Sequence, residues 1–323
     1  MAFRTPPLLE PYLRLPHEAS LILLSGVLGS STNWLVARHL HSLLASQAPS
    51  PSESADADGL ADHHHHHHHH HHQQEEGQQG RQQQHTSVVF ASFLRDYAFW
   101  KHAARRLGLD LDAARAKGSF VFVDGLTGLF MPTTMTTTTT TTISTPDRRH
   151  PQPQPIDDET AGGGRVLVAA TTDHLRRTLE DAVAHVQTRT PGTRTVLVID
   201  QPDLLIAAAG DAVSAHGLRD TILSLRERVY ACIITVSADE PLIAAQTTPL
   251  EKEHASLTLS LAHDAHLIMS LRVLETGTAK DVSGVLRVTP GGDEGVGVTS
   301  IEDRELLYFI GGDGSVRVFE RGQ

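Results

Sequence analysis

The chain has 323 residues, a formal net charge of −11 and a single cysteine. Six acidic residues oppose one arginine in residues 49–86, and four oppose two in residues 131–163, so most of the negative excess lies in these two stretches. The rest of the chain lacks the basic excess with which a domain binds RNA unaided, and one cysteine excludes an internal disulfide framework.

The two acidic stretches are of low complexity. Residues 49–86 are rich in His and Gln, and residues 131–163 are rich in Thr and Pro. We predict that both are disordered insertions, which leaves about 250 residues to build one α/β domain within residues 1–323.

The opening residues, MAFRTPPLLEPYLRLP, contain prolines and charges where a signal peptide needs an unbroken apolar stretch. No apolar run approaches the roughly 18 residues that cross a bilayer. We therefore expect a soluble intracellular protein that contacts no membrane.

The first half of the chain alternates apolar runs with helical periodicity. Strands are predicted at residues 21–25, 87–93 and 120–124, and helices follow the first two runs. Gly108 is expected to end the helix that contains Trp100, because glycine readily adopts positive φ. After the second insertion, residues 165–170 are predicted to be extended, and Thr172 or Asp173 is expected to cap a helix through Val186.

The second half begins with two further apolar strands and then changes character. Residues 196–200 and 231–236 are apolar throughout, and the second run contains Cys232. Residues 267–274 and 282–288 also look like strands. Residues 306–310 and 316–319, joined through Gly311, Gly312, Asp313 and Gly314, predict a hairpin.

Strands that are apolar at every position and alternate with amphipathic helices indicate a parallel sheet covered on both faces. With antiparallel hairpins at its C-terminal end, this pattern predicts a three-layer RecA-like domain. Doubly wound Rossmann folds share the first half of the pattern and are the alternative.

The turn after the first strand corresponds to the phosphate-binding loop of RecA-like ATPases, whose pattern is G-x-x-x-x-G-K-[ST]. Read from Gly26, the pattern fails at three positions. These have Ser31 for the second glycine, Thr32 for the lysine and Asn33 for the magnesium-binding hydroxyl residue. Loss of a charge-assisted contact of about 1.5 to 3 kcal/mol, together with the metal, should weaken nucleotide binding by orders of magnitude.

The degenerate loop therefore comprises Gly26, Gly29, Ser30, Ser31, Thr32 and Asn33. We predict no catalytic residue, no bound cofactor and no metal site. The preferred role for Ser30, Ser31 and Thr32 is to cap the following helix, although a helix N-terminus can also attract an anion.

Two carboxylates end apolar strands, as the acid that orients Mg²⁺ does in such ATPases. They are Asp124 and Asp200. An acid leaving a buried strand is also a routine turn residue. Pro202 and Asp203 suit a first helical turn, which favours the turn interpretation for Asp200.

The histidines offer no fixed metal site. His39, His41 and His102 have no acidic or cysteine partner at ligand spacing. Ten consecutive histidines at residues 63–72 could bind Zn²⁺ or Ni²⁺, but nothing beside them would fix a ligand set, so repeat expansion is the preferred explanation.

Six segments together resemble a known family, the fungal form of Elongator complex protein 6. They are LLSGVLGSSTNWLVARHLHSLL, SFLRDYAFWKHAARRLGLDL, FVFVDGLTGLF, TVLVIDQPDLLIA, LETGTAKDVSGVLRVTPGG and LLYFIGGDGSVRVFERG. The first two are the most distinctive, and the two insertions match nothing in the family.

The resemblance implies a RecA-like fold without a working phosphate loop, in agreement with the loop residues. It also implies a hexameric ring with Elongator subunits 4 and 5, attachment to the catalytic core, and tRNA binding by the ring during wobble-uridine (U34) modification. Cytoplasmic and nuclear localisation follows from the same resemblance. Arg272 and Arg287 are candidates to face a neighbouring subunit's phosphates, only because they lie in the C-terminal strands, and we do not count them as site residues.

Two other functions stay open. The chain could be an active RecA-type ATPase with an atypical phosphate loop, or a metal-storage or metal-delivery protein acting through residues 63–72. Micromolar Mg-ATP binding by the isolated chain would favour the ATPase. Loss of function on deletion of residues 49–86 would favour the metal role.

Overall fold

The structure is a computed structural model that describes residues 5–45, 85–130, 165–275, 279–292 and 301–322. Its strands, in chain order, are β1 (Ser20–Gly26), β2 (Thr86–Ser92), β3 (Phe120–Asp124), β4 (Arg165–Val166), β5 (Arg194–Asp200), β6 (Ala231–Ser237), β7 (Leu267–Arg272), β8 (Gly284–Pro290), β9 (Arg304–Ile310) and β10 (Val316–Glu320).

The α-helices are α1 (Glu10–Leu13), α2 (Asn33–Ala45), α3 (Tyr97–Arg106), α4 (Leu111–Ala116), α5 (Thr127–Phe130), α6 (Thr172–Arg189), α7 (Leu204–Ala209), α8 (Ala215–Arg226) and α9 (Pro249–Asp264). Short 3₁₀ and π turns cover Gly210–Ala212 and Pro241–Ala245.

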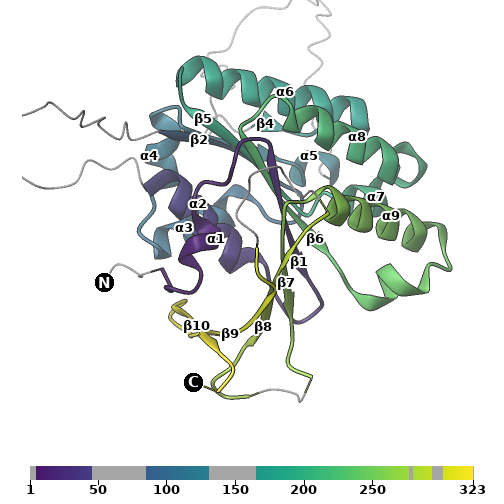
Figure 1. Cartoon of the computed structure of the whole chain (residues 1–323). Coiled ribbons are helices and arrows are strands. Elements are labelled where there is room, and N and C mark those ends of the chain that lie inside the picture. Colours follow the sequence, from purple (N-terminus) through teal and green to yellow (C-terminus); the bar gives the residue numbers. More distant parts are fainter. Residues whose placement is uncertain (1–4, 46–84, 131–164, 276–278, 293–300, 323) are drawn as a thin grey trace, which may run out of the picture.

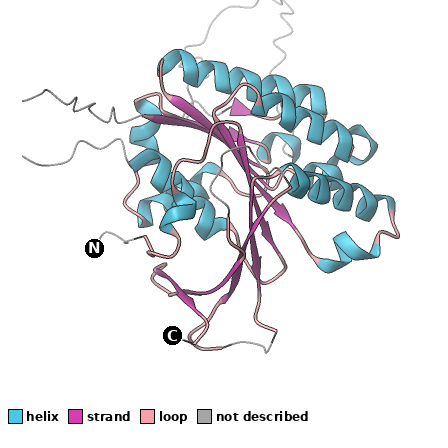
Figure 2. Ribbon diagram, viewed as in Figure 1, coloured by secondary structure: helices cyan, strands magenta, loops and turns pink. Residues whose placement is uncertain are grey.

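All strands of the described residues join one sheet in the order β10-β9-β8-β7-β1-β6-β5-β2-β3-β4. The strands from β7 to β4 run parallel, whereas β8, β9 and β10 extend the sheet through antiparallel pairs. This mixed sheet, visible in Figures 1 and 2, confirms the predicted parallel core that finishes in antiparallel hairpins.

Helices cover both faces of the sheet, because alternate residues of each strand point to opposite sides. Leu21 and Leu23 of β1 belong to the core beneath α6, α7, α8 and α9. Ile22 and Leu24 belong to the core beneath α1, α2, α3 and α4. The three predicted layers are therefore present, with the two helical layers on opposite sides of the sheet (Figure 1).

Several predicted boundaries were wrong by a few residues. β2 begins at Thr86, which is buried, so this residue belongs to the sheet and not to the first insertion. Only Arg165–Val166 of the predicted segment 165–170 is a strand. β7 ends at Arg272 instead of residue 274, and β8 begins at Gly284 instead of residue 282.

The predicted cap of α6 was also wrong. The N-cap is Thr171, whose hydroxyl accepts a hydrogen bond from the His174 amide at 3.3 Å. Thr172 and Asp173 are the first helical residues. The end of α3 was predicted correctly, because Gly108 follows it with φ of +84°.

The two predicted insertions fall almost entirely outside the described residues.

The predicted hairpin at the edge of the sheet is confirmed, with the Gly311 amide donating to the Ser315 carbonyl at 2.9 Å. Cys232 is fully buried in β6, as its apolar neighbours indicate.

Candidate functional site

The candidate site is the loop of residues 27–32 that joins β1 to α2. β1 lies between β6 and β7 in the middle of the sheet. The chain then crosses over two strands to reach β2, so the loop leaves the carboxyl end of a strand near a change of winding direction. Open α/β sheets bind ligands at such positions.

Ser30 fixes the loop to the neighbouring strand. Its Oγ lies 2.9 Å from the Leu271 carbonyl oxygen and 2.8 Å from the Val27 carbonyl oxygen, and it accepts from the Val27 amide at 3.0 Å. The Val27 amide also lies 3.2 Å from the Leu271 carbonyl. Ser30 is thus a tether between the loop and β7, and the prediction that it caps α2 was wrong.

Of the three predicted capping residues, only Ser31 contacts the first helical amide. Its Oγ accepts from the Asn33 amide at 3.3 Å. Thr32 is buried, and its carbonyl accepts from the amides of Leu35 and Val36, which begin the helix. A side chain at position 32 therefore points into a packed region.

Asp239, which follows β6, places its carboxylate against the loop. The Leu28 amide donates to Asp239 Oδ1 at 2.6 Å, and the Ser30 amide donates to the Val27 carbonyl at 2.9 Å. These amides already have acceptors, and the carboxylate of Asp239 would repel an anion. A loop that binds phosphate offers amides without acceptors and no nearby negative charge, and this loop differs from it on both points.

The tip of the loop is apolar and exposed. Leu28 is 87% exposed, and Val273 beyond β7 is also exposed. Gly29 adopts φ of +88°, and a Cβ there would lie 3.1 Å from Val273 Cγ1. The two exposed aliphatic residues therefore flank the glycine on a surface that is open to a partner.

Asp200 does not behave as the turn residue that we favoured. It is fully buried at the end of β5, where Oδ2 accepts from Ser92 Oγ at 2.9 Å and Oδ1 from Thr235 Oγ1 at 2.8 Å. Burial raises the pKa of Asp200 to about 6, although both hydroxyls counteract the shift. The carboxylate links β2, β5 and β6.

The two hydroxyls that face the Asp200 carboxylate must both act as hydrogen-bond donors to it. Ser92 Oγ accepts from Trp100 Nε1 at 3.0 Å and from the Arg95 amide at 3.2 Å. Thr235 Oγ1 accepts from the amide and the side-chain nitrogen of Gln201 at 2.9 and 3.2 Å. Each hydroxyl has used its lone pairs, so its single proton points to the carboxylate.

A second buried carboxylate lies on the other side of β6. Asp203 Oδ2 accepts from the Ser237 amide at 3.2 Å and lies 3.8 Å from His254 Nδ1, while His254 Nε2 lies 2.8 Å from the Ser237 carbonyl. Burial raises the pKa of Asp203, and His254 partly offsets the shift. The pair connects α9 to the sheet.

Asp124 has the turn role that its position predicted. Its Oδ1 accepts from the amides of Leu126 and Thr127 at 2.9 and 2.8 Å. Arg272 and Arg287, the arginines singled out in the C-terminal strands, are both paired. Arg272 contacts acids at 3.0 Å on each side, and Arg287 contacts Asp303 at 2.7 Å.

Among the described residues, no group of three or more His, Cys, Asp or Glu side chains could hold a metal ion. His39 is buried on α2, and burial lowers its pKa to about 4. The pKa of His41 is also lowered, first by burial and then by Arg38. The run at residues 63–72 lies outside the described part of the chain.

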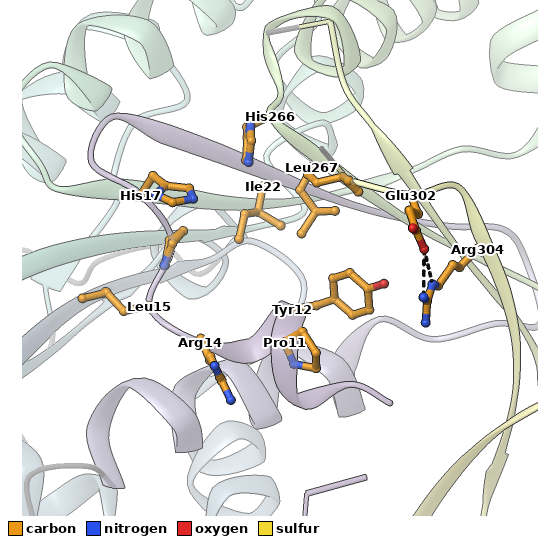
Figure 3. Close-up of a pocket in the computed structure, with 12 residues that line it drawn as sticks. Pro11, Tyr12, Arg14, Leu15, His17, Ile22, His266, Leu267, Glu302 and Arg304 are labelled. Carbon is orange, nitrogen blue, oxygen red and sulfur yellow. Dashed lines mark hydrogen bonds and ion pairs between the residues drawn. The ribbon is translucent and has the colours of Figure 1, made fainter. Parts of the chain in front are cut away.

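A cavity of about 650 Å³ at the amino end of β1 was not anticipated from the sequence. Figure 3 shows it between α1, β1, β7 and the residues before β9. His17 and His266 meet edge to face at 5.8 Å on one side, and Glu302 pairs with Arg304 at 2.8 Å on the other. Its lining mixes apolar and polar side chains.

The sheet order, the two helical layers and the loop after the central strand define a RecA-like α/β domain. A KaiC-like protein of the archaeon Pyrococcus horikoshii has a similar fold, with a TM-score of 0.51, 13% identity and coverage of 99% of this chain and 98% of that one. No helix of the described residues is long and apolar enough to span a membrane.

A family profile described as Elongation complex protein 6 matches residues 81–310, and the chain belongs to this family. The Elongator complex protein 6 homolog of Schizosaccharomyces pombe is 23% identical over 241 residues, which cover 73% of this chain and 79% of the relative. The rat protein is 24% identical and the human protein 23% identical, each over 62% of this chain and 67% of the relative.

Proposed function

We propose that this chain is a non-catalytic subunit of the Elongator complex that supports tRNA wobble-uridine modification. It would do so by assembling with subunits 4 and 5 into a hexameric ring, which attaches to the catalytic core and binds tRNA. Membership of the Elongation complex protein 6 family supports a role in Elongator. Cytoplasmic and nuclear localisation is part of the same proposal.

The loop after β1 carries the proposal that the chain hydrolyses no nucleotide. It contains no lysine, and the hydroxyl of Ser30 is engaged by Val27 and Leu271. The Leu28 amide donates to the carboxylate of Asp239, a negative charge at the point where a triphosphate would have to approach. A nucleotide would need to displace this contact without gaining a cation.

A ring role is compatible with this chemistry. In a ring of different subunits each contact is heterologous, so one subunit can supply geometry while its neighbours bind nucleotide. The exposed Leu28 and Val273 give the loop an apolar tip suited to a protein contact.

Co-expression with Elongator subunits 4 and 5, followed by native mass spectrometry, tests the assembly. We expect one stable heteromeric species in which this chain is stoichiometric. A well-behaved monomer that never associates with either subunit would contradict the proposal.

The alternative is an ATPase with an atypical loop. Titration calorimetry of Mg-ATP into the isolated chain separates the two functions, since we expect no heat of binding at micromolar concentrations. Binding that Gly29→Asp abolishes would instead support the ATPase, because Gly29 has positive φ and a side chain there would meet Val273.

A further inference from the structure

Arg38 of α2 is a largely buried cation. The residue is 4% exposed, and its Nε has no hydrogen-bond partner. Among the described residues its guanidinium forms no ion pair. Burial lowers the pKa of Arg38, and no acid offsets the shift. A buried charge in this condition is costly, because its lost hydration is not replaced.

Arg38 lines a small cavity of about 130 Å³ between α2, α3 and the β9–β10 hairpin. Arg106 of α3 lines the same cavity, as does Trp34, whose indole Nε1 is buried without a partner. Two cationic residues and a tryptophan therefore line one cavity. None of the described residues that line the cavity carries a carboxylate. The other lining residues are Asn33, Ala37, Ala103, Leu107, Ile310, Gly314 and Val316.

Asp313, in the turn between β9 and β10, is held mainly by Ser315. Asp313 Oδ1 accepts from the Ser315 amide at 2.9 Å and from its hydroxyl at 2.7 Å. Arg106 makes a long contact of 3.4 Å with the Gly312 carbonyl. The hydrogen bonds from Ser315 are the main cause that lowers the pKa of Asp313, and the charge of Arg106 adds a small contribution. A Cβ at Gly314 would collide with the Arg106 guanidinium, so the glycine leaves room for that cation over the turn.

We propose that this cavity receives the carboxylate of an aspartate or glutamate side chain from a partner protein. The carboxylate accepts hydrogen bonds from the guanidinium groups of Arg38 and Arg106, and thereby neutralises a charge that no described residue pairs. Guanidinium groups match the planar geometry of a carboxylate, and such charge-assisted bonds are among the strongest in proteins. The inference does not depend on the proposed function.

Two observations favour a protein carboxylate over an RNA phosphate. Ala37, Leu107 and Val316 give the cavity an apolar wall that suits the methylene stem of an acidic side chain. The volume of about 130 Å³ fits one such side chain and excludes a nucleotide.

The test uses the full chain and propionate, which reproduces a glutamate side chain beyond Cα. At constant pH and ionic strength, propionate should raise the thermal unfolding midpoint on the order of 2 to 4 °C above that in chloride, because a ligand stabilises the state that it binds. Propionamide, its neutral isostere, should produce no such shift. Inorganic phosphate should produce a smaller one.

Matched variants connect the effect to the cavity. Arg38→Met should abolish the propionate shift and should unfold no earlier than the wild type in chloride, since it removes an unpaired buried charge. Arg106→Met should reduce the propionate shift. Because Arg106 is exposed, this substitution should leave the fold intact. Arg105→Met, one residue away on α3, should respond as the wild type does.

An equal response of Arg38→Met and the wild type would overturn the proposal. So would a larger shift with phosphate than with propionate, because it would assign the cavity to phosphate groups. If Arg38→Met fails to fold, an Arg106→Met response identical to that of the wild type would overturn the proposal in its place.

Discussion

Ser30 shows how one hydroxyl decides the character of the loop after β1. It contacts two carbonyls and one amide across the loop and β7. Ser30→Ala should therefore lower the free energy of unfolding by about 1 to 2 kcal/mol. Urea titration measures this effect. Ser31→Ala is the matched control, because its hydroxyl makes a single 3.3 Å contact, and an equal loss in the two variants would contradict the tether.

His39 links stability to pH through burial alone. Its pKa falls to about 4 in the folded chain, from the ordinary 6.5 that the unfolded chain keeps. The unfolded state therefore binds the proton first, and this group removes stability as the pH falls from about 6.5 to 4. The loss approaches 3 kcal/mol in order of magnitude.

His39→Leu should remove this pH dependence. The stability difference between variant and wild type should grow in favour of the variant as the pH falls from 7 to 4, as measured by denaturant unfolding at each pH. His102→Leu is the control, because that imidazole is exposed on α3. A difference that stays constant over this range would refute the assignment.

Asp200 illustrates a role that the sequence pattern could not reveal. Both hydroxyls that face it are fixed as donors by their other partners, so the carboxylate must accept at both oxygens. Asp200→Asn would turn an amide N–H toward a hydroxyl without a free lone pair. We expect a loss of about 1 to 3 kcal/mol in the free energy of unfolding by urea titration at pH 8. A neutral outcome would show that the network can rearrange.

At the level of helices and strands, the pattern of apolar residues predicted the strands that are buried along nearly their whole length. β1, β5 and β6 are buried along nearly their whole length, and the parallel core follows from this pattern. α8 and α9 were missed. The buried face of α9 includes His254 and Thr258, so its pattern of apolar residues is weak.

The candidate site was predictable in position but not in detail. Its place after the first strand follows from the order of strand, glycine turn and helix. The contact between the Leu28 amide and Asp239 joins residues 211 positions apart, and the Ser30 contact with Leu271 joins residues 241 apart. Sequence spacing carries no signal for such contacts, because they depend on which strands become neighbours.

Helix capping gives a test at the same scale. Thr171 and not Thr172 caps α6, so Thr171→Ala should cost about 1 kcal/mol of stability, whereas Thr172→Ala should cost much less. Urea unfolding of the two variants compares them directly. Equal losses of stability in the two variants would contradict Thr171 as the cap and would favour the predicted cap at Thr172.

For the whole molecule, the decisive boundary is that between the first insertion and the sheet. Thr86 is buried in β2 and pairs in register with Arg194 of β5. Replacing residues 49–84 with a flexible linker should preserve assembly with Elongator subunits 4 and 5, because loop length changes the closure entropy only slowly. Extending the replacement through Thr86 removes the first residue of a central strand and should reduce the recovery of the complex. Co-purification of both deletions in parallel measures the difference. If the shorter deletion alone abolished assembly, the histidine-rich stretch would have a function that the folded domain does not supply.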